Sequence, residues 1–106
     1  MDRYAAVVDG MDPDEGERLD AELAVTDEAL VKAFALGPGG EVPPHDHPDS
    51  TNVLHVCEGE VVVVVDEAEE RVSAPGTVVV DPGAVHGARN AGDGRAVLTA
   101  TFAPAP

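Results

Sequence analysis

The middle of the chain reads Pro43-Pro44-His45-Asp46-His47-Pro48-Asp49-Ser50-Thr51-Asn52. Side chains on an extended segment alternate between its two faces, so the imidazoles of His45 and His47 point to the same side. A third histidine, His86, follows much later, shortly after the turn sequence Asp81-Pro82-Gly83. If the fold places His86 opposite the first two, three neutral imidazoles converge on one point. Such a donor set suits a divalent transition metal.

The segments around these histidines have the pattern of a β-protein. Alternation and short valine-rich runs predict strands over residues 19–25, 29–36, 52–57, 61–65, 71–72, 77–80 and 96–102. Turns containing Gly and Pro separate the strands, and no helical periodicity of any length is present. Residues 1–18 are predicted to be a short extended start followed by an acidic surface segment, and residues 66–70 a charged turn. Many short strands with such turns favour an all-β sandwich or barrel.

Five consecutive valines, residues 61–65, form an unusually apolar strand. A run of this kind is hydrophobic on both faces, so both faces should be covered. One face can line a barrel interior, and the other needs a second sheet or another subunit. We therefore expect a homodimer.

The charge of the chain limits its partners. With 106 residues it is one domain, and 21 acidic residues against 6 basic ones give a net charge of −15, with Lys32 the only lysine. Such a surface repels nucleic acid and anionic lipid, which excludes both as partners. Salt at molar concentration would screen the self-repulsion, so a halophilic host is expected, although an acidic protein of an ordinary cell has the same composition.

The expected location is cytoplasmic. Cys57 is the only cysteine, so no intrachain disulfide can form, which fits a reducing interior. The first residues show neither a long apolar stretch nor a cleavage pattern, and no segment approaches the ~20 apolar residues of a membrane span.

Two groups of residues carry a family resemblance. The first is spaced as G-x5-H-x-H-x4-N-x6-G and consists of Gly39, His45, His47, Asn52 and Gly59. The second consists of Gly76, Pro82, Gly83, His86 and Asn90. These residues resemble the two motifs of the cupin superfamily, G-x5-H-x-H-x3–4-E-x6-G and G-x5-P-x-G-x2-H-x3-N, with one residue fewer between Pro82 and Gly83. The chain is most similar to small, single-domain, RmlC-like members of the cupin 2 type.

The resemblance implies a fold and a metal site. The fold would be a double-stranded β-helix, or jelly-roll barrel, over residues 19–103, with residues 1–18 as a separate lead-in. The ligands of one divalent transition metal (Fe, Mn, Ni, Cu or Zn) would be His45, His47 and His86. The family's fourth ligand is a glutamate, and this chain has Asn52 there. A neutral amide oxygen is a weaker donor for a cation than a carboxylate, so Asn52 is an optional ligand.

Other polar residues near the motifs have ordinary explanations. His55 has the opposite strand parity to Asn52 and should face away from the site. Cys57 is expected to be a small buried hydrophobe rather than a nucleophile. Arg89 could meet an anionic substrate at the barrel mouth, but a solvated arginine paired with one of the many carboxylates is favoured. Asn90 is expected to orient backbone near the site.

Three functions remain open from the sequence. The first is a mononuclear metal enzyme, a dioxygenase or an isomerase, in which three histidines leave metal positions free for O₂, water or a chelating small molecule. The second is a non-catalytic module that binds a small ligand through its metal for sensing or storage. The third is a structural barrel with a vacant site.

Overall fold

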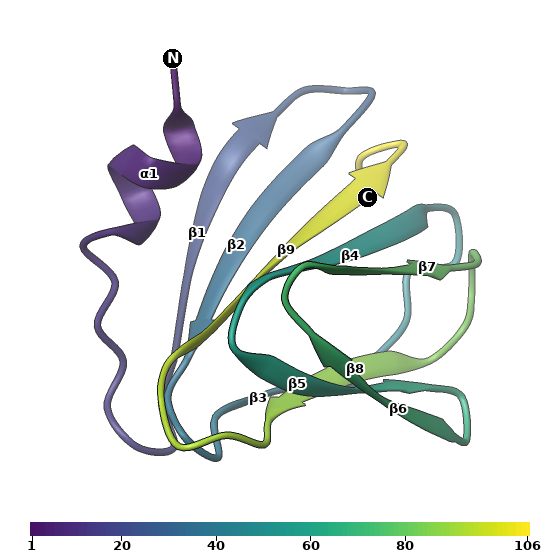
Figure 1. Ribbon diagram of the computed structural model, residues 1–106. Coiled ribbons are helices and arrows are strands. Elements are labelled where there is room, and N and C mark those ends of the chain that lie inside the picture. The colour runs from purple at the N-terminus through teal and green to yellow at the C-terminus, as the bar shows by residue number, and fades with distance from the viewer.

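The computed structural model describes all residues from Met1 to Pro106. One short helix, α1 (Arg3–Val8), precedes nine strands: β1 (Arg18–Val25), β2 (Leu30–Leu36), β3 (Glu41–His45), β4 (Thr51–Glu58), β5 (Glu60–Val65), β6 (Ala68–Ser73), β7 (Gly76–Val80), β8 (His86–Asn90) and β9 (Ala96–Ala103). The strands form an antiparallel sheet of order β1-β2-β9-β4-β7 and a second of order β3-β8-β5-β6 (Figure 1). The predicted all-β fold, a double-stranded β-helix, is confirmed. The only helix is too short to cross a membrane.

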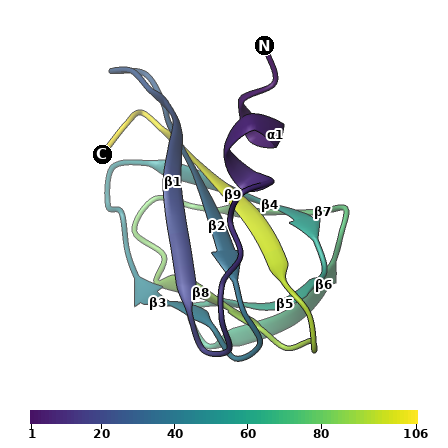
Figure 2. The ribbon, with the colours of Figure 1, turned by 90° about the vertical axis from the view of Figure 1, so that its left-hand side faces the viewer.

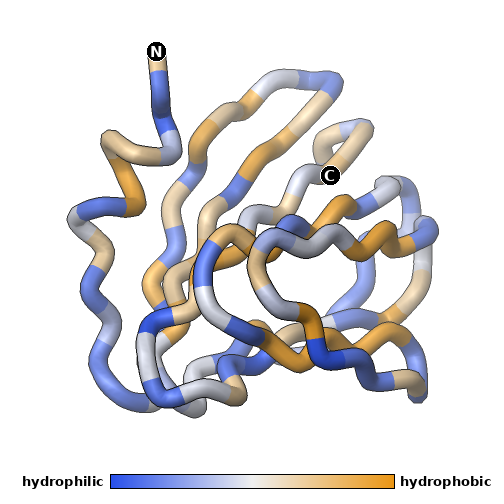
Figure 3. The backbone as a smooth tube through the Cα atoms, in the orientation of Figure 1, coloured by the Kyte–Doolittle hydropathy of each residue, from blue (hydrophilic) through white to orange (hydrophobic).

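The main core lies between the two sheets. It is built mostly from valine, leucine and alanine together with two aromatic side chains, Phe34 of β2 and Phe102 of β9. From the valine strand β5, Val61 and Val63 point into this core. Figure 3 shows hydrophobic segments along the strands and hydrophilic ones in most connecting loops. β-Branched side chains suit the pleated, buried surface of the strands, which explains the predominance of valine.

The outer face of β5 was expected to be covered by a second sheet or another subunit, but neighbouring side chains of the same sheet cover part of it. Val62 points away from the core cluster, yet it is only 4% exposed within a single chain. Its Cα partners are Arg71 of β6 and Arg89 of β8. Directly opposed residues share a face of the sheet, so the aliphatic stems of these arginines flank Val62. Burial of Val62 therefore needs no second copy, and the homodimer stays a prediction.

The amino-terminal segment differs from its predicted extended structure. Residues 3–8 form α1, with Asp2 as N-cap accepting a hydrogen bond from the Ala5 N–H at 3.0 Å. The helix lies against the outer face of the larger sheet, beside β1 and β2 (Figure 2). Val8 is completely buried there, and Met11 is nearly so. The prediction of an extended start was wrong because six residues are too few to show a helical period.

A second correction concerns residues 66–70, which were predicted as a charged turn. Only Asp66 and Glu67 connect the strands, because β6 begins at Ala68 and includes Glu69 and Glu70. β6 is an edge strand of the smaller sheet and most of its side chains are exposed, so charged residues are tolerated in it. The proposed division between a lead-in over 1–18 and a barrel over 19–103 stays a prediction.

Arg95 attaches the end of α1 to the barrel. Its guanidinium donates to both carboxylate oxygens of Glu58, at 2.6 and 3.1 Å. It also donates to the carbonyl oxygens of Val8, at 3.0 Å, and Met11, at 2.7 Å. The hydrogen bonds from Arg95 lower the pKa of Glu58. One side chain thus joins β4, the segment before β9, the last residue of α1 and Met11 after it.

We expect Arg95→Met to lower the free energy of unfolding by about 2 kcal/mol, because hydrogen bonds to charged groups contribute about 1.5–3 kcal/mol. The Arg95 side chain is 27% exposed and that of Glu58 is 45% exposed, so solvent weakens the ion pair and much of the effect comes from the hydrogen bonds to the Val8 and Met11 carbonyls. Since the folded pKa of Glu58 lies below its unfolded value, the pair stabilises the fold above the unfolded pKa and loses this effect as the pH falls through the folded pKa.

Urea unfolding at about pH 7 and about pH 3, on either side of the ordinary carboxylate range, checks this expectation. The difference between wild type and Arg95→Met should narrow at the lower pH. The control is Arg71→Met, which breaks a pair with Glu60 whose arginine is far more exposed than Arg95, and it should cost clearly less stability. Equal losses for the two variants would contradict the role of Arg95.

Candidate metal centre

Three histidines meet at one end of the barrel interior. His45 ends β3 and His86 begins β8, and the two residues are directly paired across these strands. His47 follows two residues after His45. The nitrogens that could bind a metal, one from each of the three residues, all lie within 4.8 Å of one another. Strand pairing thus brings together the imidazoles that the sequence places far apart.

Backbone carbonyls hold two of these rings in one tautomer. His45 Nδ1 lies 2.8 Å from the Pro43 carbonyl oxygen, and His86 Nδ1 lies 2.9 Å from that of Ala84. A carbonyl oxygen can only accept, so in both residues Nδ1 carries the proton and Nε2 keeps its lone pair. The Nε2 atoms are therefore the available donors to a metal.

Burial favours the neutral form of the site. It is the main cause that lowers the pKa of His86, and it also lowers the pKa of His47, with smaller effects from the neighbouring His45 and His86. The His47 ring also meets Phe102 edge-on, with ring centroids 4.5 Å apart. An uncharged imidazole is the form that binds a metal.

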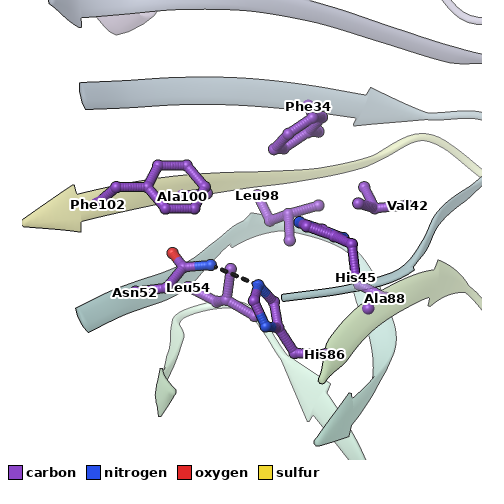
Figure 4. A pocket seen from close by; sticks show the side chains of 11 residues that line it. Phe34, Val42, His45, Asn52, Leu54, His86, Ala88, Leu98, Ala100 and Phe102 are labelled. Atoms are coloured by element: carbon purple, nitrogen blue, oxygen red, sulfur yellow. Dashed lines mark hydrogen bonds between the residues drawn. The ribbon is translucent and has the colours of Figure 1, made fainter. Parts of the chain in front are cut away.

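Asn52 of β4 completes the inner side of the site. It is 1% exposed, and its Nδ2 donates to His86 Nε2 at 2.9 Å (Figure 4). Its Oδ1 is buried without any hydrogen-bond partner. Turning the amide by 180° would exchange the two atoms and present Oδ1 toward the histidines. Leaving a buried acceptor unsatisfied costs about 1–3 kcal/mol, and a cation bound between the imidazoles could satisfy it.

Two hollows adjoin the histidines. The inner one, of about 20 Å³, is lined by His45, Asn52 and His86 and otherwise mainly by apolar side chains (Figure 4). Its volume suits one water molecule or one ligand atom. The outer one is an open groove of about 430 Å³ lined by both His45 and His47. His45, Val42, Phe34 and Phe102 border both hollows, so the groove leads to the histidines.

Other predicted positions lie where alternation places them. His55 is exposed and its Nδ1 lies 2.9 Å from Thr77 Oγ1, away from the three histidines. Cys57 is half-buried near α1, and burial raises the pKa of its thiol, which makes it a poor nucleophile. Arg89 forms a bidentate pair with Glu69, at 3.1 and 3.3 Å, and does not line the groove with the histidines. The prediction of a solvated, paired Arg89 is confirmed.

Asn90 orients backbone, as expected. Its Nδ2 donates to the carbonyl oxygens of Leu36, at 2.9 Å, and Gly94, at 2.7 Å, while its Oδ1 accepts from the Gly92 N–H at 2.9 Å.

Sequence reasoning missed three charged residues of the groove, namely Arg18, Asp20 and Lys32. The sequence did contain a signal for them, because each is a charged residue within a strand whose other positions are largely apolar.

Comparison with known proteins agrees with this geometry. A family model described as the cupin domain matches residues 33–102, which include Asn52 and all three histidines. The chain belongs to the cupin family. The cupin resemblance drawn from the two motifs is thereby confirmed.

Individual relatives support the same assignment. Germin-like protein 1-1 of Oryza sativa subsp. japonica is 36% identical over 70 residues. The match covers 61% of this cupin and 32% of the relative, so this cupin spans about a third of the relative's length. The crystal structure of TT1209 from Thermus thermophilus has a TM-score of 0.81 and 32% identity, covering 85% of this cupin and 86% of TT1209. An RmlC-like cupin from Shewanella frigidimarina NCIMB 400 has a TM-score of 0.77 and 28% identity, covering 89% and 82%.

Proposed function

We propose that this cupin binds one divalent transition metal through His45, His47 and His86, with the Asn52 Oδ1 as a fourth and weaker ligand. The observation that carries the proposal is the convergence of three imidazole nitrogens within 4.8 Å, two of them with their tautomer set by a backbone carbonyl. The buried, unpartnered Oδ1 of Asn52 supports the same conclusion, because turning the amide by 180° would direct this oxygen toward the histidines in place of Nδ2.

The activity that fits this centre best is a dioxygenase-like reaction or an isomerisation of a small oxygenated molecule. A bound metal would supply Lewis acidity or O₂ activation. The chain's own residues provide a neutral donor set, a largely apolar inner hollow that limits water, and an open groove for the substrate. Because no carboxylate belongs to the donor set, the negative charge that balances the cation would come from the substrate.

A non-catalytic role is the second candidate. Apart from His45 and His86, no residue that lines the inner hollow is ionisable. A reaction that needs a carboxylate base beside the metal therefore has no such group there, which favours ligand capture for sensing or storage. The two candidates share the metal and differ only in turnover.

Metal titration of purified protein at molar KCl tests the proposal. Calorimetry with Fe(II), Mn(II), Co(II), Ni(II), Cu(II) and Zn(II), added separately, should show one binding site per chain for at least one ion. Oxygen uptake and product analysis with small oxygenated molecules then separate the candidates, because turnover supports the enzyme and binding without turnover supports the module. Absence of binding for every ion would contradict both and leave a structural barrel.

The remaining proposals concern setting and assembly. A cytoplasmic location, a halophilic host and a homodimer stay predictions from charge, cysteine usage and the valine strand. They do not affect the metal proposal, because all four proposed ligands belong to a single chain.

A further inference from the structure

Strand β1 has its polar residues on the side where a barrel strand usually carries apolar ones. Leu19, Ala21 and Leu23 pack in the cluster beneath α1, on the outer face of the sheet. Alternation then turns Arg18, Asp20 and Glu22 toward the opposite, barrel side. Figure 3 shows this alternation of hydrophilic and hydrophobic residues along β1. All three charged side chains are solvent-exposed, so this face of β1 borders an open groove and not the core.

Two cations and one anion from β1 and β2 line the groove that leads to the histidines. Arg18, Lys32 and Asp20 share the groove with His45 and His47. The cations lie near the same aromatic ring, that of Phe34, with Arg18 Cζ 6.0 Å and Lys32 Nζ 5.3 Å from its centroid. Contacts with the face of an aromatic ring hold cations in place at such distances.

Arg18 differs from the other arginines in having no polar partner. Arg71, Arg89 and Arg95 each form an ion pair, and Arg3 donates to the Leu23 carbonyl oxygen. Arg18 forms no ion pair and no hydrogen bond, although the chain has 21 acidic residues. A guanidinium presents a planar fork that matches a carboxylate in two parallel hydrogen bonds. The fork of Arg18 is therefore available to a ligand in the groove.

The groove charge is positive against a strongly negative background. Asp20 is 3.4 Å from Lys32 and offsets it, so the three charged residues that line the groove sum to one positive charge. Glu22 is paired with Lys32 across the two strands but does not line the groove. This occurs in a chain with a net charge of −15 and only 6 basic residues. A metal on the neutral donor set would add further positive charge at the inner end of the groove. Both ends of the groove would then favour an anion.

We propose that the groove binds a small, doubly anionic molecule. One carboxylate pairs with Arg18, assisted by Lys32, and the other oxygen-bearing end reaches the three histidines and their metal. The inner end of this proposal rests on the metal function proposed above, whereas the Arg18 end does not. A volume of about 430 Å³ is of the size found for small-molecule sites.

Succinate and glutarate are suitable probes, with succinamide and glutaramide as neutral counterparts. Calorimetry with Zn(II)-loaded protein at one fixed KCl concentration should show dicarboxylate binding and much weaker diamide binding. Arg18→Gln should weaken dicarboxylate binding by about tenfold or more, because it removes a charge-assisted hydrogen-bonding partner. Asp20→Asn should strengthen it by roughly threefold to tenfold, because it removes a nearby like charge.

The matched control is Arg71→Gln, which removes one positive charge away from the groove. It should change dicarboxylate affinity by less than about twofold, since exposed charges that far from a ligand are largely screened. Equal losses in Arg18→Gln and Arg71→Gln would show a net-charge effect only and overturn the proposal. Dicarboxylates that bind no better than diamides would overturn it as well, with metal binding unaffected.

The two proposals fail in different ways. Arg18→Gln should leave the metal titration unchanged, because Arg18 is not a ligand. If no metal binds but succinate still binds the metal-free protein in an Arg18-dependent manner, the metal function fails and the anion site stands. If metal binds and succinate does not, the metal function stands and the anion site fails.

Discussion

His86→Ala is expected to remove measurable metal binding. The variant deletes one of three imidazoles in a buried position, where His86 is only 2% exposed. Loss of a direct ligand should exceed the roughly 10–100-fold loss of affinity typical of an outer-shell partner. Calorimetry with Co(II), and the visible absorption of bound Co(II), report the change directly.

His55→Ala provides the matched control for this prediction. It also removes an imidazole from the barrel wall, but His55 is exposed and bonded to Thr77 rather than to the site. Its metal affinity should equal that of the wild type. His86→Gln separates ligation from folding, because the amide can still accept the hydrogen bond from Asn52. Strong metal binding by His86→Ala would refute the proposed centre.

Asn52→Asp is expected to make stability depend on metal. Without metal the variant places a carboxylate in a position that is 1% exposed and has no cationic partner, so the free energy of unfolding should fall by about 3 kcal/mol. With Zn(II) or Co(II) the same carboxylate becomes a charged ligand. Metal affinity should then exceed that of the wild type, and the thermal midpoint should rise more on metal addition.

Asn90→Asp is the control for this second prediction. Asn90 is also buried, but its amide bonds to backbone groups of Leu36, Gly92 and Gly94 and not to the histidines. Its destabilisation should persist whether or not metal is present. Thermal unfolding of both variants, with a chelator and with added Zn(II), provides the measurement. Equal responses of the two variants to metal would contradict a ligand position for residue 52.

Local signals in the sequence account for most of the fold. The valine strand, the paired histidines and the Gly/Pro turns each depend on neighbours within a few residues, so periodicity and turn chemistry predict them. The helix α1 and the start of β6 were missed for opposite reasons. α1 is too short to display a period, and Glu69 and Glu70 look like loop residues although an exposed edge strand accommodates them.

The candidate site, too, could be predicted from the sequence only in part. The motif spacing predicts that His45, His47 and His86 belong together, and the paired strands β3 and β8 bring them there. The groove cations were not predicted. Alternation along residues 18–23 shows that one face is charged and the other apolar, but it cannot show which face turns toward the barrel until α1 covers the apolar one.

By itself the sequence determined the all-β class, the acidic surface and the three histidines on extended segments, because these follow from composition and from the two-residue period of a strand. Only the tertiary structure decided that Asn52 donates to His86 while its own oxygen stays unsatisfied, and that Arg18 faces the groove without a partner. The reason is that hydrogen-bond partners and the facing of a strand depend on residues far away in the chain, which only the packing of helix and sheets brings into contact.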